Sequence, residues 1–330
     1  MSATKITRTR SSLLALFLLF LPLLVFSNSA DAQKPRYPEK NITTIVMWPA
    51  GGGADTAMRF FTKQLEKMVG RTIIVQNMPG GGGSIGYMAA KNARPDGYTL
   101  VNIQGDLPKY KPMGLAPIDI SDYDILGGFG FQAPIIVARG DAPWNSIKDF
   151  VEDAKKRPGK LTAGITDISG TYHQPLVLWM DGAGFSVRAI VQEGSPQQTA
   201  ALLGGHVDVN VTWIRPNIPY VKEGKLKFLG YMGAERTPDF PTVPTFKELG
   251  YDIVWEHPYG IGGPKGLPED ARAVVSEATK KIWEMPEFKS DLEKLGLYVF
   301  KKDGPAYVKH LQKMQEDMGK ALRLIKEQPK

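Results

Sequence analysis

Two successive strand–glycine–helix passages constrain the fold of this chain more than any other feature. The β-rich run Thr43–Met47 leads into Gly51–Gly53, and an amphipathic helix is predicted from about Asp55. Its apolar stripe, with residues three or four positions apart, comprises Met58, Phe61, Leu65 and Met68. A second predicted strand, Thr72–Gln76, leads into Gly80–Gly83 and a helix of small residues. Because parallel strands joined in this way open their carboxyl ends on one crevice, we expect an α/β protein with a ligand cleft there.

The first glycine loop is predicted to bind an anion. Glycine lets the backbone approach a ligand closely, and the free N–H groups of the following helical turn point at the same space. The helix dipole also favours negative charge there. The alternative is a tight β-to-α turn that binds nothing. In the second loop, Gly81, Gly83 and Gly86 satisfy G-x-G-x-x-G, but a run of four glycines meets many such patterns by chance, and no cofactor is predicted.

Residues 1–32 are predicted to be a cleaved signal peptide. Basic residues precede the apolar stretch Leu13–Phe26, which is short for a membrane span, and Ala30–Ala32 fits a small-residue cleavage site. With cleavage after Ala32, the mature chain begins at Gln33 and is expected in the periplasm, without a membrane span of its own. The chain contains no cysteine, which excludes disulfides and a lipid anchor on cysteine.

The charge of the chain does not indicate a nucleic-acid partner. Removing residues 1–32 lowers the net charge from +7 to +5, and the remaining basic residues are spread out. No basic stripe is interleaved with aromatic residues, so we expect no nucleic acid to bind.

The rest of the chain alternates strand and helix patterns, which extends the α/β prediction. Further strands are predicted at Tyr98–Ile103, Pro134–Ala138, Leu161–Ile165, Val187–Val191, Val207–Val211 and Leu226–Tyr231. Helices are predicted over Ile147–Lys156, from a Ser195 cap to Leu203, and over most of the chain after Pro268. The polar loops 166–171 and 193–196 precede helices and carry donors suited to an anion.

Five motifs occur in a specific order and spacing. They are Trp48–Asp55 with Arg59, Asn77–Gly83, Pro95–Leu100, Leu203–Asp208 and Pro241–Gly250. On these motifs the chain resembles the Bug family of extracytoplasmic solute receptors, the binding components of tripartite tricarboxylate transporters. The resemblance covers nearly the whole mature chain, from about residue 37 to residue 300.

The resemblance implies a two-lobed periplasmic-binding-protein fold of type II, with the ligand cleft between the lobes. The chain is expected to cross between the lobes near Gly128–Pro134 and to return near Trp255–Gly263. Lobe one would then comprise residues 33–130 and 257–330, and lobe two residues 131–256. The implied function is to capture a small carboxylate, largely through backbone amides, hydroxyl groups and water, and to deliver it to the membrane permease subunits of a tripartite transporter.

The residues and the resemblance together predict a ligand site with contributions from both lobes. It comprises Trp48, Ala50, Gly51, Gly52, Gly53, Asp55, Gly82, Gly83, Ser84, Asp106, Thr166, Ser169, Gly170, Thr171, Gly194 and Asp208. Trp48 stands where the family is expected to carry Phe. Asp106 and Asp167 have two interpretations: either faces the cleft and pairs with an ammonium or hydroxyl group of the ligand, or it serves in a surface turn or a helix cap.

No catalytic pattern supports an enzyme. G-x-S-x-G and H-E-x-x-H are absent, and the four histidines lack metal-ligand spacing; they are His173, His206, His257 and His310. A binding protein without metal or cofactor is therefore predicted. The alternatives are an exported hydrolase or isomerase acting on a small acid, and a ligand-sensing input to a membrane sensor. Recognition through amides and water leaves little trace in residue identity, so the sequence predicts the class of ligand and not the individual acid.

Overall fold

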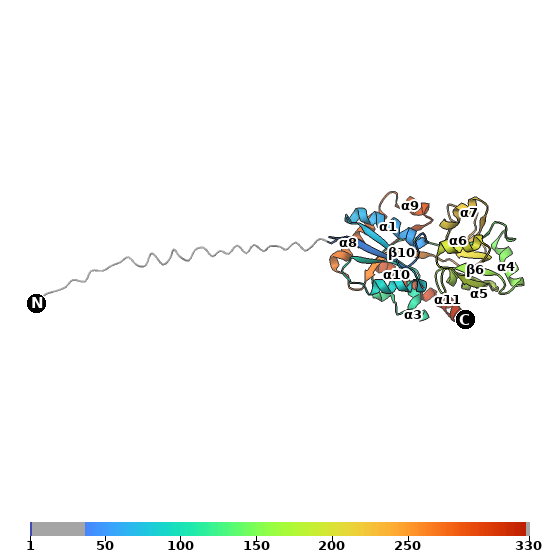
Figure 1. The fold of residues 1–330 in the computed structure, drawn as a ribbon, viewed down its shortest axis with the longest axis horizontal. Helices are drawn as coiled ribbons and strands as arrows, with labels where there is room; N and C mark the ends of the chain where they lie inside the picture. The colour runs from blue at the N-terminus through green and yellow to red at the C-terminus, as the bar shows by residue number, and fades with distance from the viewer. Residues whose placement is uncertain (2–36, 328–330) are drawn as a thin grey trace. The chain divides into compact units, whose positions relative to one another are not determined.

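Two β-sheets organise the protein, whose computed structural model describes Met1 and residues 37–327 (Figure 1). The first sheet has the strands β1 (Ile42–Val46), β2 (Ile73–Asn77), β3 (Thr99–Gln104), β4 (Tyr123–Gln132), β10 (His257–Pro264) and β11 (Tyr298–Asp303). The second has β5 (Ile135–Arg139), β6 (Thr162–Ile165), β7 (Arg188–Val191), β8 (Val209–Thr212) and β9 (Leu226–Tyr231). Their orders are β11-β4-β10-β3-β1-β2 and β7-β6-β8-β5-β9. The predicted signal peptide and its cleavage site lie outside the described residues.

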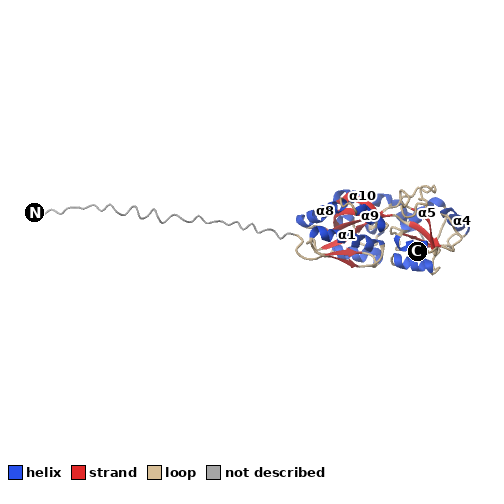
Figure 2. Ribbon diagram, turned by 90° about the horizontal axis from the view of Figure 1, so that it is seen from above, coloured by secondary structure: helices blue, strands red, loops and turns tan. Residues whose placement is uncertain are grey.

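Helices flank both sheets, which confirms the predicted two-lobed α/β fold (Figure 2). We call each sheet, with the helices that cover it, a lobe. The helices are α1 (Gly53–Val69), α2 (Ser84–Lys91), α3 (Tyr110–Met113), α4 (Ile147–Lys156), α5 (His173–Ala183), α6 (Ser195–Leu203), α7 (Ile218–Lys222), α8 (Glu269–Trp283), α9 (Phe288–Lys294), α10 (Gly304–Asp317) and α11 (Gly319–Glu327). Helices α1, α8 and α10 belong with the first sheet, and α4, α5 and α6 with the second (Figure 1).

Strand β1 lies between β2 and β3 and runs parallel to both. Both predicted glycine loops therefore open at the same edge of the first sheet. The apolar stripe of α1 is confirmed for Met58, Phe61 and Leu65, which are fully buried. Met68 was expected in the same stripe but is exposed, because it lies in the last turn before the left-handed cap Gly70.

Strands β4, β10 and β11 were not predicted, and the first two are rich in glycine. β4 and β10 pair antiparallel in the middle of the first sheet. A Cβ atom at Gly260 would collide with the Tyr307 ring, and one at Gly128 would collide with Phe300. Glycine is usually depleted in strands, so its presence here reflects close packing of aromatic rings on the sheet.

The chain passes between the two sheets through one short and one longer segment. β4 of the first sheet ends at Gln132 and β5 of the second begins at Ile135, while the return lies between Tyr231 and His257. The exact lobe boundaries remain a prediction. Helix α11 adds a further connection, because it packs against α5 of the second lobe and also contacts α3 of the first. Lys320 on α11 pairs with Asp181 on α5 at 2.7 Å.

We predict that Ile325→Ala loosens the contact between α11 and the second lobe. Ile325 is only 7% exposed and belongs to the same apolar cluster as Leu176 and Met180 of α5. Loss of a buried aliphatic side chain costs about 2–5 kcal/mol of unfolding free energy, as measured by urea denaturation. The control is Ile85→Ala, where the side chain is half exposed and the expected loss is within about 0.5 kcal/mol. Equal losses in the two variants would contradict the assigned packing.

Candidate functional site

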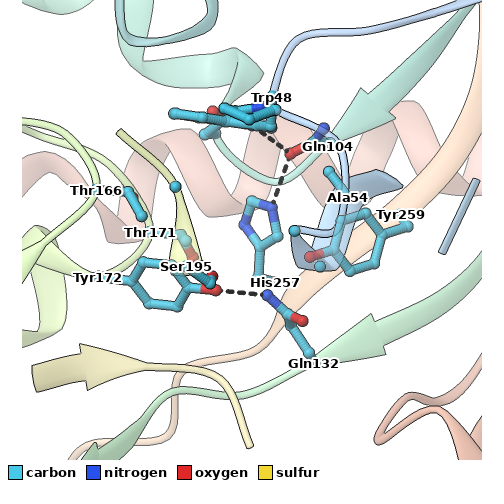
Figure 3. A pocket seen from close by; sticks show the side chains of 15 residues that line it. Trp48, Ala54, Gln104, Gln132, Thr166, Thr171, Tyr172, Ser195, His257 and Tyr259 are labelled. Carbon is cyan, nitrogen blue, oxygen red and sulfur yellow. Dashed lines mark hydrogen bonds between the residues drawn. The ribbon is translucent and has the colours of Figure 1, made fainter. Parts of the chain in front are cut away.

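A cavity lies between the two lobes at the carboxyl ends of β1 and β3 (Figure 3). The first lobe lines it with Trp48, Pro49, Gly52, Gly53, Ala54, Gln104, Asp106, Gln132, His257 and Tyr259. The second lobe lines it with Thr166, Thr171, Tyr172, Gly194 and Ser195. A second, outer cavity shares Trp48, Pro49 and Thr166 with the first and is also lined by Gly82, Lys109 and Asp167.

The start of α1 forms one wall of the inner cavity. Gly52 is the N-cap residue and makes no side-chain cap hydrogen bond, so the helix begins with backbone N–H groups that no side chain of the cap satisfies. Asp55 shapes the preceding loop, because its carboxylate accepts from the Gly51 N–H at 3.0 Å and from Arg59 Nε and Asn77 Nδ2 at 2.9 Å. Burial would raise the pKa of Asp55, but these bonds outweigh burial and hold the pKa below its usual value.

The start of α6 faces this wall from the second lobe. Gly194 has a left-handed backbone (φ 89°) and precedes Ser195, the first residue of the helix. A Cβ atom at Gly194 would lie 3.4 Å from the Pro49 ring, so the loops of the two lobes meet here. Two helix N-termini therefore border one cavity, and each favours negative charge.

Gln104 organises the side chains on the first-lobe wall (Figure 3). Its Oε1 accepts from Trp48 Nε1 at 3.1 Å and lies 3.2 Å from His257 Nε2, while its Nε2 donates to Asn102 Oδ1 at 2.6 Å. Because Oε1 is an acceptor, this network assigns the proton of the neutral imidazole to Nε2. Burial, and then the charge of Lys109, lower the pKa of His257 to about 3, so the ring stays neutral.

A second contact joins the lobes through neutral groups. Gln132 on β4 donates from Nε2 to the hydroxyl of Tyr172 at 2.7 Å (Figure 3). Tyr172 directly precedes α5. Both side chains line the inner cavity. This hydrogen bond connects the first-lobe wall to the loop that contributes Thr166 and Thr171.

A buried charged cluster crosses from one lobe to the other. Lys109 is fully buried, its Nζ hydrogen-bonds Asp167 of the second lobe, and it lies 3.6 Å from Asp106 Oδ2 of the first. Burial alone would lower the pKa of Lys109, but the two carboxylates raise it, so the ammonium stays charged. Burial raises the pKa of Asp106 and of Asp167, and the charge of Lys109 opposes this. The cluster carries a net charge of −1 when all three groups are ionised.

Both aspartates therefore face the region between the lobes. Asp106 and Asp167 are 2% and 6% exposed, which rules out a surface turn for either. Asp106 precedes a short helical turn, Leu107–Lys109, but makes no side-chain cap bond with it. Lys109, the partner of both, was not identified from the sequence, because nothing in a lone lysine indicates that it is buried.

The chain matches a known receptor family over most of its length. The family model described as "Tripartite tricarboxylate transporter family receptor" matches residues 57–329. The chain belongs to this family. It is 33% identical over 272 residues to the UPF0065 protein in gbd 5'region of Cupriavidus necator, covering 81% of this chain and 82% of that protein. It is 27% identical over 252 residues to Protein BugT of Bordetella pertussis, covering 75% and 77%.

The fold is shared with a solved structure, MatC from Rhodopseudomonas palustris with bound malate. The TM-score is 0.79 at 22% sequence identity, and the match covers 87% of this chain and all of the other. These comparisons confirm the predicted Bug-type receptor family and its two-lobed fold. Among residues 37–327, no group of three or more His, Cys, Asp or Glu side chains is placed to hold a metal ion. Within the same range, no helix has the length and apolar character needed to cross a membrane.

The structure brings about half of the predicted site residues to the cavities of this receptor. Seven line the inner cavity: Trp48, Gly52, Gly53, Asp106, Thr166, Thr171 and Gly194. Gly82 lines the outer one. Seven line neither cavity and lie in the same loops or in the first turns of the helices that follow them: Ala50, Gly51, Asp55, Gly83, Ser84, Ser169 and Gly170. Ligand contact stays a prediction for all of them.

Asp208 lies elsewhere in the second lobe. Its carboxylate accepts from the backbone N–H and the hydroxyl of Thr162, both at 2.8 Å, at the start of β6. The cavities lie at the opposite ends of the strands, so we leave Asp208 out of the proposed site.

Sequence reasoning missed Gln104, Gln132, Tyr172, Ser195, His257 and Tyr259 as lining residues. Gln104 had a usable signal, because it directly follows a predicted strand at the edge where the glycine loops open. The sequence analysis did not predict the strands β4 and β10. It therefore could not place the residues on them at the cavity, namely Gln132, His257 and Tyr259.

We predict that His257 makes stability fall as the pH falls. A histidine with a pKa of about 3 when folded and about 6.5 when unfolded takes up a proton on unfolding, so its contribution is complete above about pH 6.5 and is lost toward pH 3. Between about pH 8 and pH 5, His257→Gln should lose about 2 kcal/mol less unfolding free energy than the unmodified protein. The exposed His206→Gln is the control in the same urea titrations. An unchanged pH dependence in His257→Gln would refute a neutral, buried imidazole.

Proposed function

We propose that this protein is a periplasmic receptor that closes on a small carboxylate and delivers it to the permease subunits of a tripartite transporter. Export by a signal peptide cleaved after Ala32 is part of the proposal. Membership of the receptor family supports the transport role. The ligand is bound and released unchanged in this proposal, so the acid recovered from the purified protein should be chemically intact by mass spectrometry.

The observation that carries the proposal is the pair of helix N-termini on opposite sides of one buried cavity. Gly52 and Gly53 bring the first turn of α1 to the cavity without a side chain, and Gly194 brings the first turn of α6 to it beside the Ser195 hydroxyl. A carboxylate can accept from several backbone N–H groups at such a site. Each of these bonds strengthens as water leaves the cavity.

The bound malate of MatC is in keeping with this class of ligand. Malate belongs to that protein, and at 22% identity the likeness extends to the fold alone. The choice of a carboxylate for this chain rests on its own family and on the donors of its own cavity.

We predict that a broad thermal-shift screen of mono-, di- and tricarboxylates and aromatic acids will include a stabilising ligand. An acid present at about 100 times its dissociation constant adds about 2.7 kcal/mol to the unfolding free energy. A screen in which no acid raises the melting temperature would refute the proposed ligand class.

Gly52→Val should then abolish binding of the acid that the screen identifies. Gly52 has an extended backbone (φ −77°, ψ 172°) that valine tolerates, but its Cβ atom would lie 3.3 Å from the Pro49 carbonyl oxygen, so the cavity loop must shift while the rest of the fold should persist. The control is Gly182→Val on α5, where an added Cβ atom meets open space. Calorimetry that shows the same affinity in Gly52→Val and in the control would place the site elsewhere.

Ligand binding should also draw the lobes together, because donors on both walls reach the ligand only when the walls meet. The radius of gyration from solution scattering should fall when a ligand already shown to bind is added. Trp48 lines the cavity, so its fluorescence should change at the same time. An unchanged radius together with unchanged fluorescence would favour a rigid, open receptor.

A further inference from the structure

One oxygen of Asp106 lines the inner cavity without a hydrogen-bond partner. The residue is 2% exposed, and Oδ1 makes no hydrogen bond of ordinary length among the described residues, although the Tyr87 hydroxyl lies near the carboxyl and helps to lower its pKa. Its other oxygen, Oδ2, faces Lys109 Nζ at 3.6 Å. An ionised carboxylate accepts through both oxygens, and a buried acceptor without a donor is costly, so a donor group of the ligand would be favourable at this oxygen.

The charges around the cavities point to the kind of donor. Lys109 is the one ammonium or guanidinium group among the residues that line the two cavities, and two buried carboxylates share it. Glu193, an exposed carboxylate at the outer cavity, adds charge of the same sign. A second carboxylate of a ligand would be repelled here, whereas a positive group would be attracted.

Two further acceptors line the same cavity without partners. They are Gln132 Oε1 and the Thr171 hydroxyl oxygen. Gln132 Oε1 and Asp106 Oδ1 can only accept, and the Thr171 hydroxyl can accept or donate, so an ammonium group, which only donates, suits this lining. A ligand hydroxyl has a single donor and would leave the charge of the cluster unchanged.

We propose that the ligand is an amino-carboxylate, whose ammonium group pairs with Asp106 while its carboxylate binds the first turns of α1 and α6. This assignment rests on the proposed carboxylate-binding function and narrows it. It makes Asp106 the residue that selects for the amino group, and it places the two ends of the ligand against opposite charges.

The test uses acids that differ only at one position. Succinate, malate and aspartate carry hydrogen, hydroxyl and ammonium groups on the same four-carbon skeleton, and propionate with alanine and 3-phenylpropionate with phenylalanine extend the panel to other sizes. Isothermal titration calorimetry with the full mature chain should show that, for at least one skeleton, the amino acid binds at least tenfold more tightly than its amino-free counterpart.

Asp106→Asn should remove this preference. The variant keeps the shape of the side chain and loses its charge, so the amino acid should lose at least tenfold in affinity while the amino-free acid changes less than threefold. Asp141→Asn is the control, since Asp141 is exposed and pairs with Arg139 away from both cavities. Thr171→Val tests the same subsite in case Asp106→Asn does not fold, and should weaken the amino acid selectively.

The outcomes separate this inference from the proposed function. If the amino-free acids bind as tightly as the amino acids, or the hydroxy acid binds most tightly, the inference is overturned and the carboxylate receptor stands. If Asp106→Asn weakens both members of a pair equally, Asp106 does not select for the amino group. If no acid in the panel or in the wider screen binds, both proposals fail.

Discussion

The buried ammonium of Lys109 is the interaction on which the arrangement of the two lobes depends. A charge without water is tolerated only when it is paired, and the partners of Lys109 come from both lobes. Separating the lobes would take Asp167 away from Lys109, and water would have to replace it. The cluster therefore favours a closed arrangement, while its excess of negative charge leaves it incomplete. A ligand that supplies positive charge would stabilise the closed arrangement further.

In the rest of the site, the backbone and the side chains contribute different kinds of contact. The glycine loops bring helix N-termini to the cavity and exclude side chains, which suits a carboxylate of almost any acid. Gln104, His257 and Trp48 form a fixed wall through bonds with one another. The backbone donors bind the carboxylate group that all these acids share. Discrimination between acids therefore depends on the few charged side chains that line the cavity, above all on Asp106.

Sequence periodicity predicted the local elements well where a single pattern determines them. The helix over Ile147–Lys156 and the strand Leu226–Tyr231 have the predicted bounds, whereas the helix that ends at Leu203 has Gly194 and not Ser195 as its N-cap and so begins one residue earlier than predicted. It failed where tertiary packing decides, as in β4 and β10, whose glycines accept aromatic rings from distant segments. The site residues were likewise predicted best in the loops after β1 and β6, because local sequence patterns determine these loops. The burial of Lys109 depends on a carboxylate 58 residues away, which no local pattern reveals.

Helix α11 changes what opening of this receptor would involve. Because it contacts α5 and α3 together, it works as a strap across the gap, and the lobes cannot swing on their two connecting segments alone. Opening must either slide α11 along α5, exposing apolar surface, or carry α11 with one lobe and strip it from the other. The width of the gap is thus limited by a contact remote from the ligand. Substitutions on the strap would tune how long a ligand resides without touching the groups that recognise it.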